Sequence, residues 1–289
     1  GFRDRPVRPL RHLSADGQNA YRVQPVDLER DTSRSAIALQ DCPPNQRPSP
    51  YNRYATIDLR MSEPAANSQP ISELPEIPIF DIGDGGPIAL FEAYPDRAAD
   101  IIRLGQEQYG PKLISGLDEL SRLWSSYAGN VHNTEIASIA NKLPRGVWFM
   151  NLCLEWGCTS GVMEDPTAPG MRLLRTLDWP FHGLGRNLVI ARQTGPAGEF
   201  YNLTWPAFAG VVQAMAPGRF AVALNQAPLV RRLTLPVYVD WLYNKIKTFA
   251  GRRIPPVHLL RRVIENCRTY NEALDVLTRT PIALPAIFS

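Results

Sequence analysis

The spacing of apolar residues changes near residue 157, and this change constrains the fold of the 289-residue chain more than any other feature. From residue 86 to 141 the spacing is helical, as Leu117, Leu120, Leu123, Trp124 and Tyr127 illustrate. After residue 158 the apolar stretches become short and alternate with polar residues, which is typical of strands. The sequence therefore predicts an α+β protein with helices first, then a sheet, then helices again.

Helices are expected at both ends of this pattern. Residues 93–105 and the segment around Leu117 predict a helical hairpin, which leads into the apolar run 147–154. Residues 236–249 predict a later helix, and residues 257–267 another with a single apolar face. That face consists of Leu259, Leu260, Val263, Ile264 and Cys267. Thr269 and Glu272 form a capping-box pattern for a last helix that ends near Leu277.

Short strands are expected between these helices and at the end of the chain. The alternating stretches are residues 173–177, 188–192 and 200–204, followed by a hairpin of 208–215 and 219–224 that turns at 216–218. Residues 282–288 also read as a strand, so we expect a partner strand for them, and more protein beyond Ser289 or on another chain. Residues 54–61 predict one further strand, within a Pro- and Arg-rich segment 1–75 that favours an extended arm.

Composition argues against a nucleic-acid-binding protein. The 31 basic residues are offset by 28 acidic ones, for a formal net charge of +3. The arginine pairs at 231–232, 252–253 and 261–262 are expected on the solvated surface. No apolar run reaches the length of about 18 residues that a membrane helix needs. The chain is therefore expected to be soluble, with a lysosomal, secreted or bacterial cytoplasmic location all open.

The cysteines and histidines do not have the spacing of a metal site. Cys42, Cys153, Cys158 and Cys267 show no pair of Cys-x-x-Cys motifs. The histidines, His12, His132, His182 and His258, are scattered along the chain. We therefore expect no zinc site, no other metal and no cofactor.

Cys158 lies in a pattern of residues that favours thiol chemistry. Thr159 and Ser160 follow it directly, and Arg175 and Asp178 lie within 20 residues of it. A guanidinium stabilises a thiolate, and a nearby carboxylate can hold a cationic amine. Without further information a cysteine in an apolar run is more often packed in the core, and an Arg-x-x-Asp step is more often a surface ion pair. Both interpretations stay open on residue types alone.

Three motifs in order resemble a known family of enzymes. They are Cys158-Thr-Ser160, Arg175-Thr-Leu-Asp178 and Ala223-Leu-Asn-Gln226. They are similar to those of the N-terminal-nucleophile cysteine amidases of the choloylglycine hydrolase superfamily, closest to the acid ceramidase and N-acylethanolamine acid amidase branch. The resemblance extends from about residue 54 to the end of the chain.

The chain also departs from this family's pattern at several positions. Thr176 stands where the family has asparagine, and Gln226 where the ceramidase branch has glutamate. The arginine falls one residue late, which leaves Arg172 as the alternative to Arg175.

The resemblance implies a four-layer αββα sandwich of two stacked antiparallel sheets, preceded by a helical small subunit. Residues 54–157, including a first strand at 56–59, would form the α-subunit. Residues 158–289 would form the N-terminal part of the β-subunit, and residues 1–53 an extended arm or tail. Self-cleavage between Gly157 and Cys158 would leave an α/β heterodimer.

The resemblance also implies a mechanism. The freed α-amine of Cys158 would act as general base for its own thiol, which attacks an amide carbonyl. Arg175 would stabilise the sulfur and the substrate, Asp178 would orient the amine, and Asn225 would contribute to the oxyanion site.

The implied substrate is a linear amide of an N-acyl lipid, either a ceramide or an N-acylethanolamine. Gln226, Trp179 and Phe208 are expected to contact it, and an acyl pocket would be lined by Trp156, Trp179, Phe181, Trp205 and Phe208. The partners are therefore this small-molecule or lipid substrate and a peripheral contact with a membrane or lipid aggregate. The alternatives are a penicillin-V or bile-salt type acylase, an N-acyltransferase, and a non-catalytic relative that acts as a binding protein.

Overall fold

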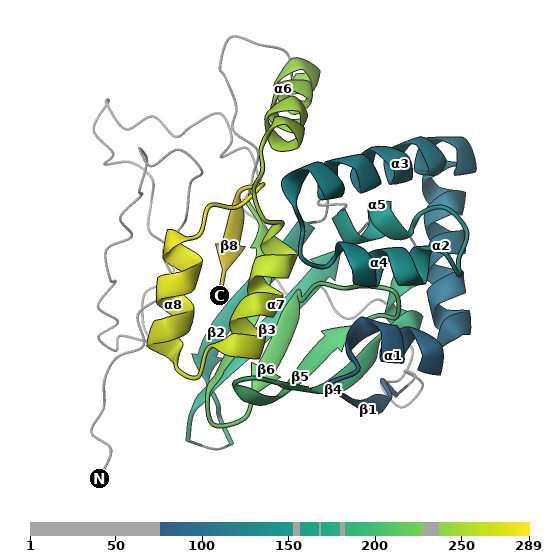
Figure 1. Ribbon diagram of the computed structural model, residues 1–289. Helices are drawn as coiled ribbons and strands as arrows, with labels where there is room; N and C mark the ends of the chain where they lie inside the picture. Colours follow the sequence, from purple (N-terminus) through teal and green to yellow (C-terminus); the bar gives the residue numbers. More distant parts are fainter. Residues whose placement is uncertain (1–75, 153–156, 168, 180–182, 228–236) are drawn as a thin grey trace, which may run out of the picture. The chain divides into compact units, whose positions relative to one another are not determined.

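A six-stranded sheet has helices packed against it (Figure 1), with the strand order β1-β4-β5-β6-β7-β8. Its strands are Ile79–Gly83 (β1), Val189–Gly195 (β4), Gly198–Thr204 (β5), Gln213–Ala216 (β6), Phe220–Gln226 (β7) and Ala286–Phe288 (β8). The computed structural model describes residues 76–152, 157–167, 169–179, 183–227 and 237–289, all within one unit. β1 runs parallel to β4 and the other neighbours are antiparallel, so the expectation of purely antiparallel sheets is wrong for β1.

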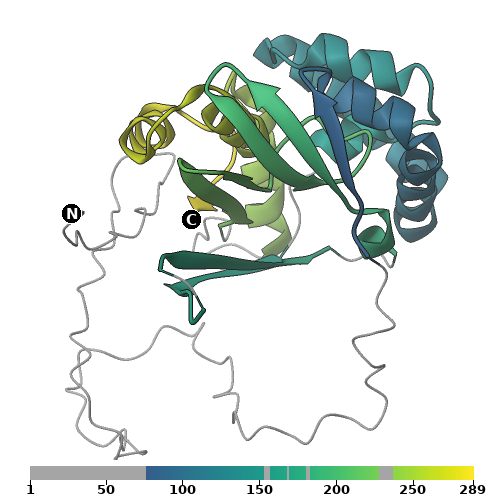
Figure 2. The same cartoon turned by 90° about the horizontal axis from the view of Figure 1, so that it is seen from below.

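A separate pair of antiparallel strands, Gly157–Glu164 (β2) and Met171–Asp178 (β3), carries the predicted nucleophile. Figure 2 shows this ribbon on the side of the large sheet away from the helices that precede residue 157. Both strands contact β7. The α+β class is thereby confirmed, whereas the complete four-layer sandwich stays a prediction.

Five helices precede residue 157 in the described part of the chain, where the helical spacing predicts a helical hairpin. They are Gly86–Ala93 (α1), Pro95–Tyr109 (α2), Pro111–Ala128 (α3), Asn133–Ala140 (α4) and Val147–Leu152 (α5). Proline in the first turn favours the start of both α2 and α3, and Gly129 ends α3 with a φ of 66°. On α3 only Trp124 of the predicted face is buried, since Leu120, Leu123 and Tyr127 are exposed.

The C-terminal helices are Val237–Ala250 (α6), Pro256–Asn266 (α7) and Tyr270–Arg279 (α8), close to the predicted bounds. All five residues of the predicted apolar face at 257–267 are buried. The Thr269 hydroxyl accepts the Glu272 N–H at 3.2 Å, which confirms the cap of α8. A short 3₁₀ helix, Leu184–Asn187 (η3), lies before β4.

The C-terminal strand has a partner, as expected, but this partner belongs to the described part of the chain and not to a further segment or another chain. β8 pairs with β7, with Leu224 opposite Phe288 and Gln226 opposite Ala286. The strands expected at 173–177, 188–192, 200–204 and 219–224 correspond to β3, β4, β5 and β7, while β6 begins at Gln213 instead of residue 208. β1 and β2 were not expected, and the strand predicted at 54–61 lies outside the described residues.

Residues from both sides of position 157 share one hydrophobic core. Ile102 and Trp148 from the helices pack in the same cluster as Phe200 from β5 and Leu260 from α7. The helical segment and the sheet therefore stabilise each other, because neither would bury its apolar face alone.

One surface expectation is wrong. Arg261 is only 9% exposed, although its neighbour Arg262 is exposed as expected. The fold also brings His132 and His258, 126 residues apart in the chain, into ring contact with centroids 4.9 Å apart. Within the described residues, no helix is both long and apolar enough to cross a bilayer.

Candidate active site

The thiol of Cys158 lies near the start of β2, half-buried beside the end of β7. The Arg175 side chain, from β3, donates from Nη2 to Cys158 Sγ at 3.0 Å. The backbone N–H of Gln226 also hydrogen-bonds to the sulfur. The structure therefore brings together Cys158, Arg175 and one backbone donor, as an anionic sulfur would require.

Arg175 is held in place by a backbone carbonyl. Its Nε and Nη2 donate to the Leu224 oxygen at 3.1 and 2.9 Å. Among the described residues it has no carboxylate within ion-pair distance. Burial lowers the pKa of Arg175, although Cys158 and Asp178 act in the opposite direction. The guanidinium is therefore a partly buried cation whose nearest partners are a neutral thiol and a carbonyl.

Three consecutive residues of β7 organise the site. The Leu224 carbonyl holds Arg175, the Asn225 side chain contacts Ser160, and the Gln226 N–H contacts Cys158. The Asn225 amide pairs at both ends when its oxygen accepts from Ser160 N at 3.2 Å and Ser160 Oγ at 2.8 Å. Its nitrogen then donates to the Leu224 oxygen at 3.1 Å. The end of β7 thus fixes the relative positions of β2 and β3 at the sulfur.

The electrostatic balance at the sulfur keeps the thiol protonated at neutral pH. Burial raises the pKa of Cys158 above its ordinary value, and the charge of Asp178 adds to this effect. Arg175 and the Gln226 N–H oppose it without overcoming it. Since the thiolate is the reactive form, this arrangement needs a proton acceptor to become nucleophilic.

The structure distinguishes the two candidate arginines. Arg172 forms an exposed ion pair with Asp165, with Nη2 and Oδ1 2.9 Å apart. Arg175 instead lies opposite Ser160 in the β2–β3 register and reaches the sulfur. The two side chains point to opposite faces of β3, since their positions differ by an odd number of residues.

The other predicted site residues occupy different surroundings. Asp178 lies opposite Gly157 in the register, exposed at the end of β3. Asn225 is buried and contacts Ser160. Trp179 and Phe208 are both packed in the hydrophobic core, where the Trp179 indole donates to the Tyr109 hydroxyl at 3.1 Å.

Two of the residues expected around the acyl chain, Trp156 and Phe181, lie outside the described residues. Trp205 is buried and stacks on Phe208 with ring centroids 4.5 Å apart. The positions of Trp179, Trp205 and Phe208 therefore favour a role in core packing over contact with an acyl chain.

A contact between two serines at the site was also not foreseen from sequence. The hydroxyls of Ser160 and Ser289 lie 2.8 Å apart, which ties β2 to the residue after β8. The only signal for it is the serine of the Cys-Thr-Ser motif. Nowhere in the described part of the chain do three or more His, Cys, Asp or Glu side chains group as a metal site.

Comparison with known proteins identifies a similar enzyme. Over 132 residues the chain is 30% identical to an N-acylethanolamine-hydrolyzing acid amidase of Caenorhabditis elegans. The match covers 45% of this chain and 35% of the amidase, so the chain spans about a third of that relative's length. No family model matches the chain.

Proposed function

We propose that the chain carries the nucleophile of a cysteine amidase that hydrolyses linear amides of N-acyl lipids. The observation that carries the proposal is the 3.0 Å contact between Arg175 Nη2 and Cys158 Sγ, with Arg175 anchored on the Leu224 carbonyl. The similarity to an N-acylethanolamine-hydrolyzing amidase supports this substrate class over other amides.

The proposed chemistry starts with cleavage of the chain itself. The Cys158 sulfur attacks the carbonyl carbon of Gly157, the thiol proton passes to the peptide nitrogen as the C–N bond breaks, and water hydrolyses the resulting thioester. The products are a carboxylate on Gly157 and a free α-amine on Cys158. This amine, with an ordinary pKa of about 7.7–8.0, is the proton acceptor that the thiol needs, because burial keeps the sulfur protonated.

The same sulfur then acts on the substrate. The α-amine takes the thiol proton, the sulfur adds to the amide carbonyl, and the proton passes to the leaving amine as the C–N bond breaks. Water hydrolyses the acyl-thioester and releases a fatty acid. Arg175 is proposed to stabilise the negative charge that develops on sulfur and oxygen, since no described carboxylate neutralises it. Asp178 is proposed to orient the α-amine, and Asn225 to support the oxyanion site.

Intact-mass spectrometry of the purified chain tests the first step. After incubation at mildly acidic and at neutral pH, two fragments divided between Gly157 and Cys158 are expected, with masses that sum to the chain plus one water. The Cys158→Ala variant should remain whole, whereas Cys267→Ala, which removes the buried cysteine after α7, should cleave normally. The cleaved protein should release fatty acid from an N-acylethanolamine.

A chain that stays whole and forms no acyl-thioester with an N-acylethanolamine would contradict the proposal. Equal cleavage of the Cys158→Ala variant would contradict the self-processing step alone, because a contaminating protease would then explain the cut.

A further inference from the structure

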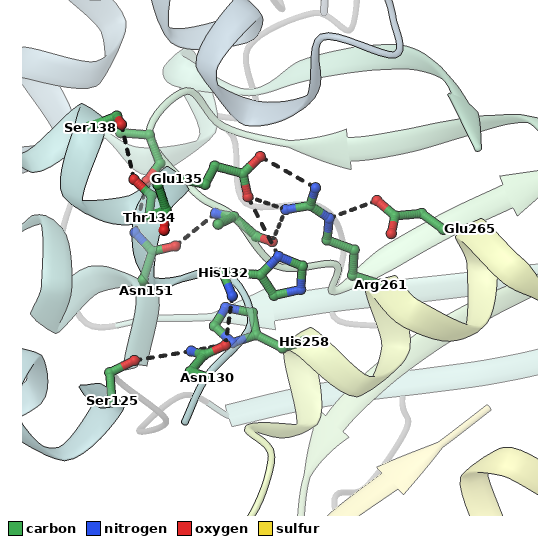
Figure 3. Close-up of polar contacts among 12 residues, drawn as sticks. Ser125, Asn130, His132, Thr134, Glu135, Ser138, Asn151, His258, Arg261 and Glu265 are labelled. Atoms are coloured by element: carbon green, nitrogen blue, oxygen red, sulfur yellow. Dashed lines mark hydrogen bonds and ion pairs between the residues drawn. The ribbon is translucent and has the colours of Figure 1, made fainter. Parts of the chain in front are cut away.

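A polar cluster connects the helices before residue 157 to helix α7 (Figure 3). Asn130, His132 and Glu135 come from the loop before α4 and from α4 itself, and His258 and Arg261 come from α7. The cluster lies within the protein, since His258 is fully buried and Arg261 is nearly so. It forms no part of the Cys158 site.

Arg261 is the central cation of the cluster. It pairs with Glu135 on α4, donates from Nε to Glu265 Oε1 at 2.7 Å and donates from Nη1 to the Ala209 carbonyl at 2.9 Å. Burial lowers its pKa, but the two carboxylates outweigh this effect, so the pKa of Arg261 is raised. Burial raises the pKa of Glu135, yet contacts with His132 and Arg261 hold it below its ordinary value. The ion pair therefore stays charged between neutral and mildly acidic pH.

The hydrogen bonds of Asn130 determine the protonation state of His258. The Asn130 oxygen accepts the backbone N–H of His132 at 3.1 Å, and its nitrogen donates to Ser125 Oγ at 3.0 Å. Ser125 Oγ uses its own proton on Asn133 Oδ1, 2.6 Å away. The Asn130 nitrogen, 3.0 Å from His258 Nδ1, can therefore only donate to that ring nitrogen. Nδ1 must accept, so the imidazole is neutral with its proton on Nε2.

A second proton on His258 would have no favourable partner. It would set the Nδ1–H against the amide N–H₂ of Asn130, and it would add a cation beside Arg261 and His132. Arg261 and His132 are the basic groups that face His258 in the described residues, and the carboxylates of Glu135 and Glu265 pair with Arg261. The Nε2 atom has no hydrogen-bond partner among the described residues. Burial, followed by His132 and Arg261, lowers the pKa of His258 well below its ordinary value.

The cluster continues into the loop at residues 205–212. Asn151 on α5 holds that loop, since its oxygen accepts from Ala209 N at 2.7 Å and its nitrogen donates to the Ala207 carbonyl at 2.8 Å. Ala207 has a φ of 72°, which is unfavourable for a residue with a Cβ atom and persists because these contacts hold it. Asn151, before position 157 in the sequence, and Arg261, after it, therefore both hydrogen-bond to the same short loop.

We propose that His258 makes this cluster an acid-sensitive joint between the helices before residue 157 and the sheet with α7. The joint is defined by the contacts of Asn130 with His258 and of Arg261 with Glu135 and Ala209. When these contacts are formed the joint is closed, and His258 must be neutral. When they are broken the joint is open, and His258 can take up a proton with the ordinary histidine pKa of about 6.5. The joint is therefore fully stable above that pH and weakens as the pH falls below it.

Hydrogen exchange on the full chain with the Cys158→Ala substitution tests the joint separately from the proposed amidase chemistry. Peptides from α4 and from residues 205–212 should lose about tenfold in protection between about pH 7.5 and 5.5, after correction for intrinsic exchange, because open His258 binds one proton. The β4–β5 hairpin should change much less. In His258→Asn, which keeps an acceptor for Asn130 but does not titrate, the loss should shrink to about twofold or less.

An equal loss in His258→Asn, the absence of a loss in the parent chain, or an equal loss in all regions would overturn the proposal. If His258→Asn does not fold, the His258 Cε1–H resonance of the parent chain decides the question. A titration midpoint below about 5.5 supports the joint, and a higher midpoint overturns it. Since Cys158 is absent throughout, neither result bears on the amidase proposal.

Discussion

Two arginines, half-buried Arg175 at the candidate site and buried Arg261 at the joint, have opposite electrostatic surroundings. Arg261 is paired with Glu135 and Glu265, and these anions raise its pKa in spite of burial. Arg175 has a thiol and a carbonyl as partners, and burial lowers its pKa. A buried cation with its counter-ions serves the fold, whereas one that lacks a carboxylate is available to an anion that forms during a reaction.

The largest effect is expected at the paired arginine. Arg261→Met leaves the half-buried carboxylates of Glu135 and Glu265 without their cation, so the free energy of unfolding should fall by about 3–5 kcal/mol. Urea denaturation followed by circular dichroism measures this change. The matched control is Arg262→Met, the exposed neighbour on the same helix, which should leave the urea midpoint unchanged. If Arg261→Met and Arg262→Met lowered the urea midpoint equally, the ion pairs of Arg261 would not explain the loss of stability.

A smaller effect, on reactivity instead of stability, is expected at the other arginine. Arg175→Met removes the cation that opposes the raised pKa of Cys158, so this pKa should rise further. At about pH 8.5 alkylation of Cys158 by iodoacetamide should slow roughly tenfold, because a neighbouring opposite charge is worth about one pKa unit or more.

Peptide mass spectrometry follows this alkylation at Cys158 separately from the other cysteines. Arg172→Met, which removes the exposed partner of Asp165 on the same strand, is the control and should react at the parent rate. An unchanged alkylation rate in Arg175→Met would show that the 3.0 Å contact has no electrostatic consequence.

The smallest effect, with the opposite sign, is expected at Asp178. Its charge raises the pKa of Cys158, so Asp178→Asn should lower that pKa and speed alkylation about two- to threefold below about pH 9. The same alkylation assay measures it, with Asp165→Asn as a control for an acid that pairs elsewhere. Slower alkylation in Asp178→Asn would mean that the carboxylate acts mainly by positioning Arg175.

Local patterns predicted most of the described secondary structure. The apolar face of α7 and the cap of α8 follow from residues within one or two helical turns, and both are confirmed. The alternation around Arg175 likewise placed it on a strand, where β3 is found. The same reasoning failed for α3, whose Leu120, Leu123 and Tyr127 are exposed, because periodicity identifies a helix without showing which face meets the core.

The contact between Cys158 and Arg175 required more than a local pattern. The alternation around Arg175 predicted its own strand but not the strand that carries Cys158. The anchor of Arg175 is the carbonyl of Leu224, 49 residues further along the chain. The contact of Ser160 with Asn225 depends on the same approach of β7 to the hairpin. Such contacts follow from sheet packing, which single-sequence patterns do not encode.

The sequence by itself determined the order of helices and strands, the apolar face of α7 and the strand that carries Arg175. Only the tertiary structure decided which arginine has counter-ions and that His258 is neutral. Arg261 and its partner Glu135 are 126 residues apart, and His258 is 128 residues from Asn130. The physical reason is that burial and the choice of charged partner set a side chain's protonation, and both arise only when distant segments pack together.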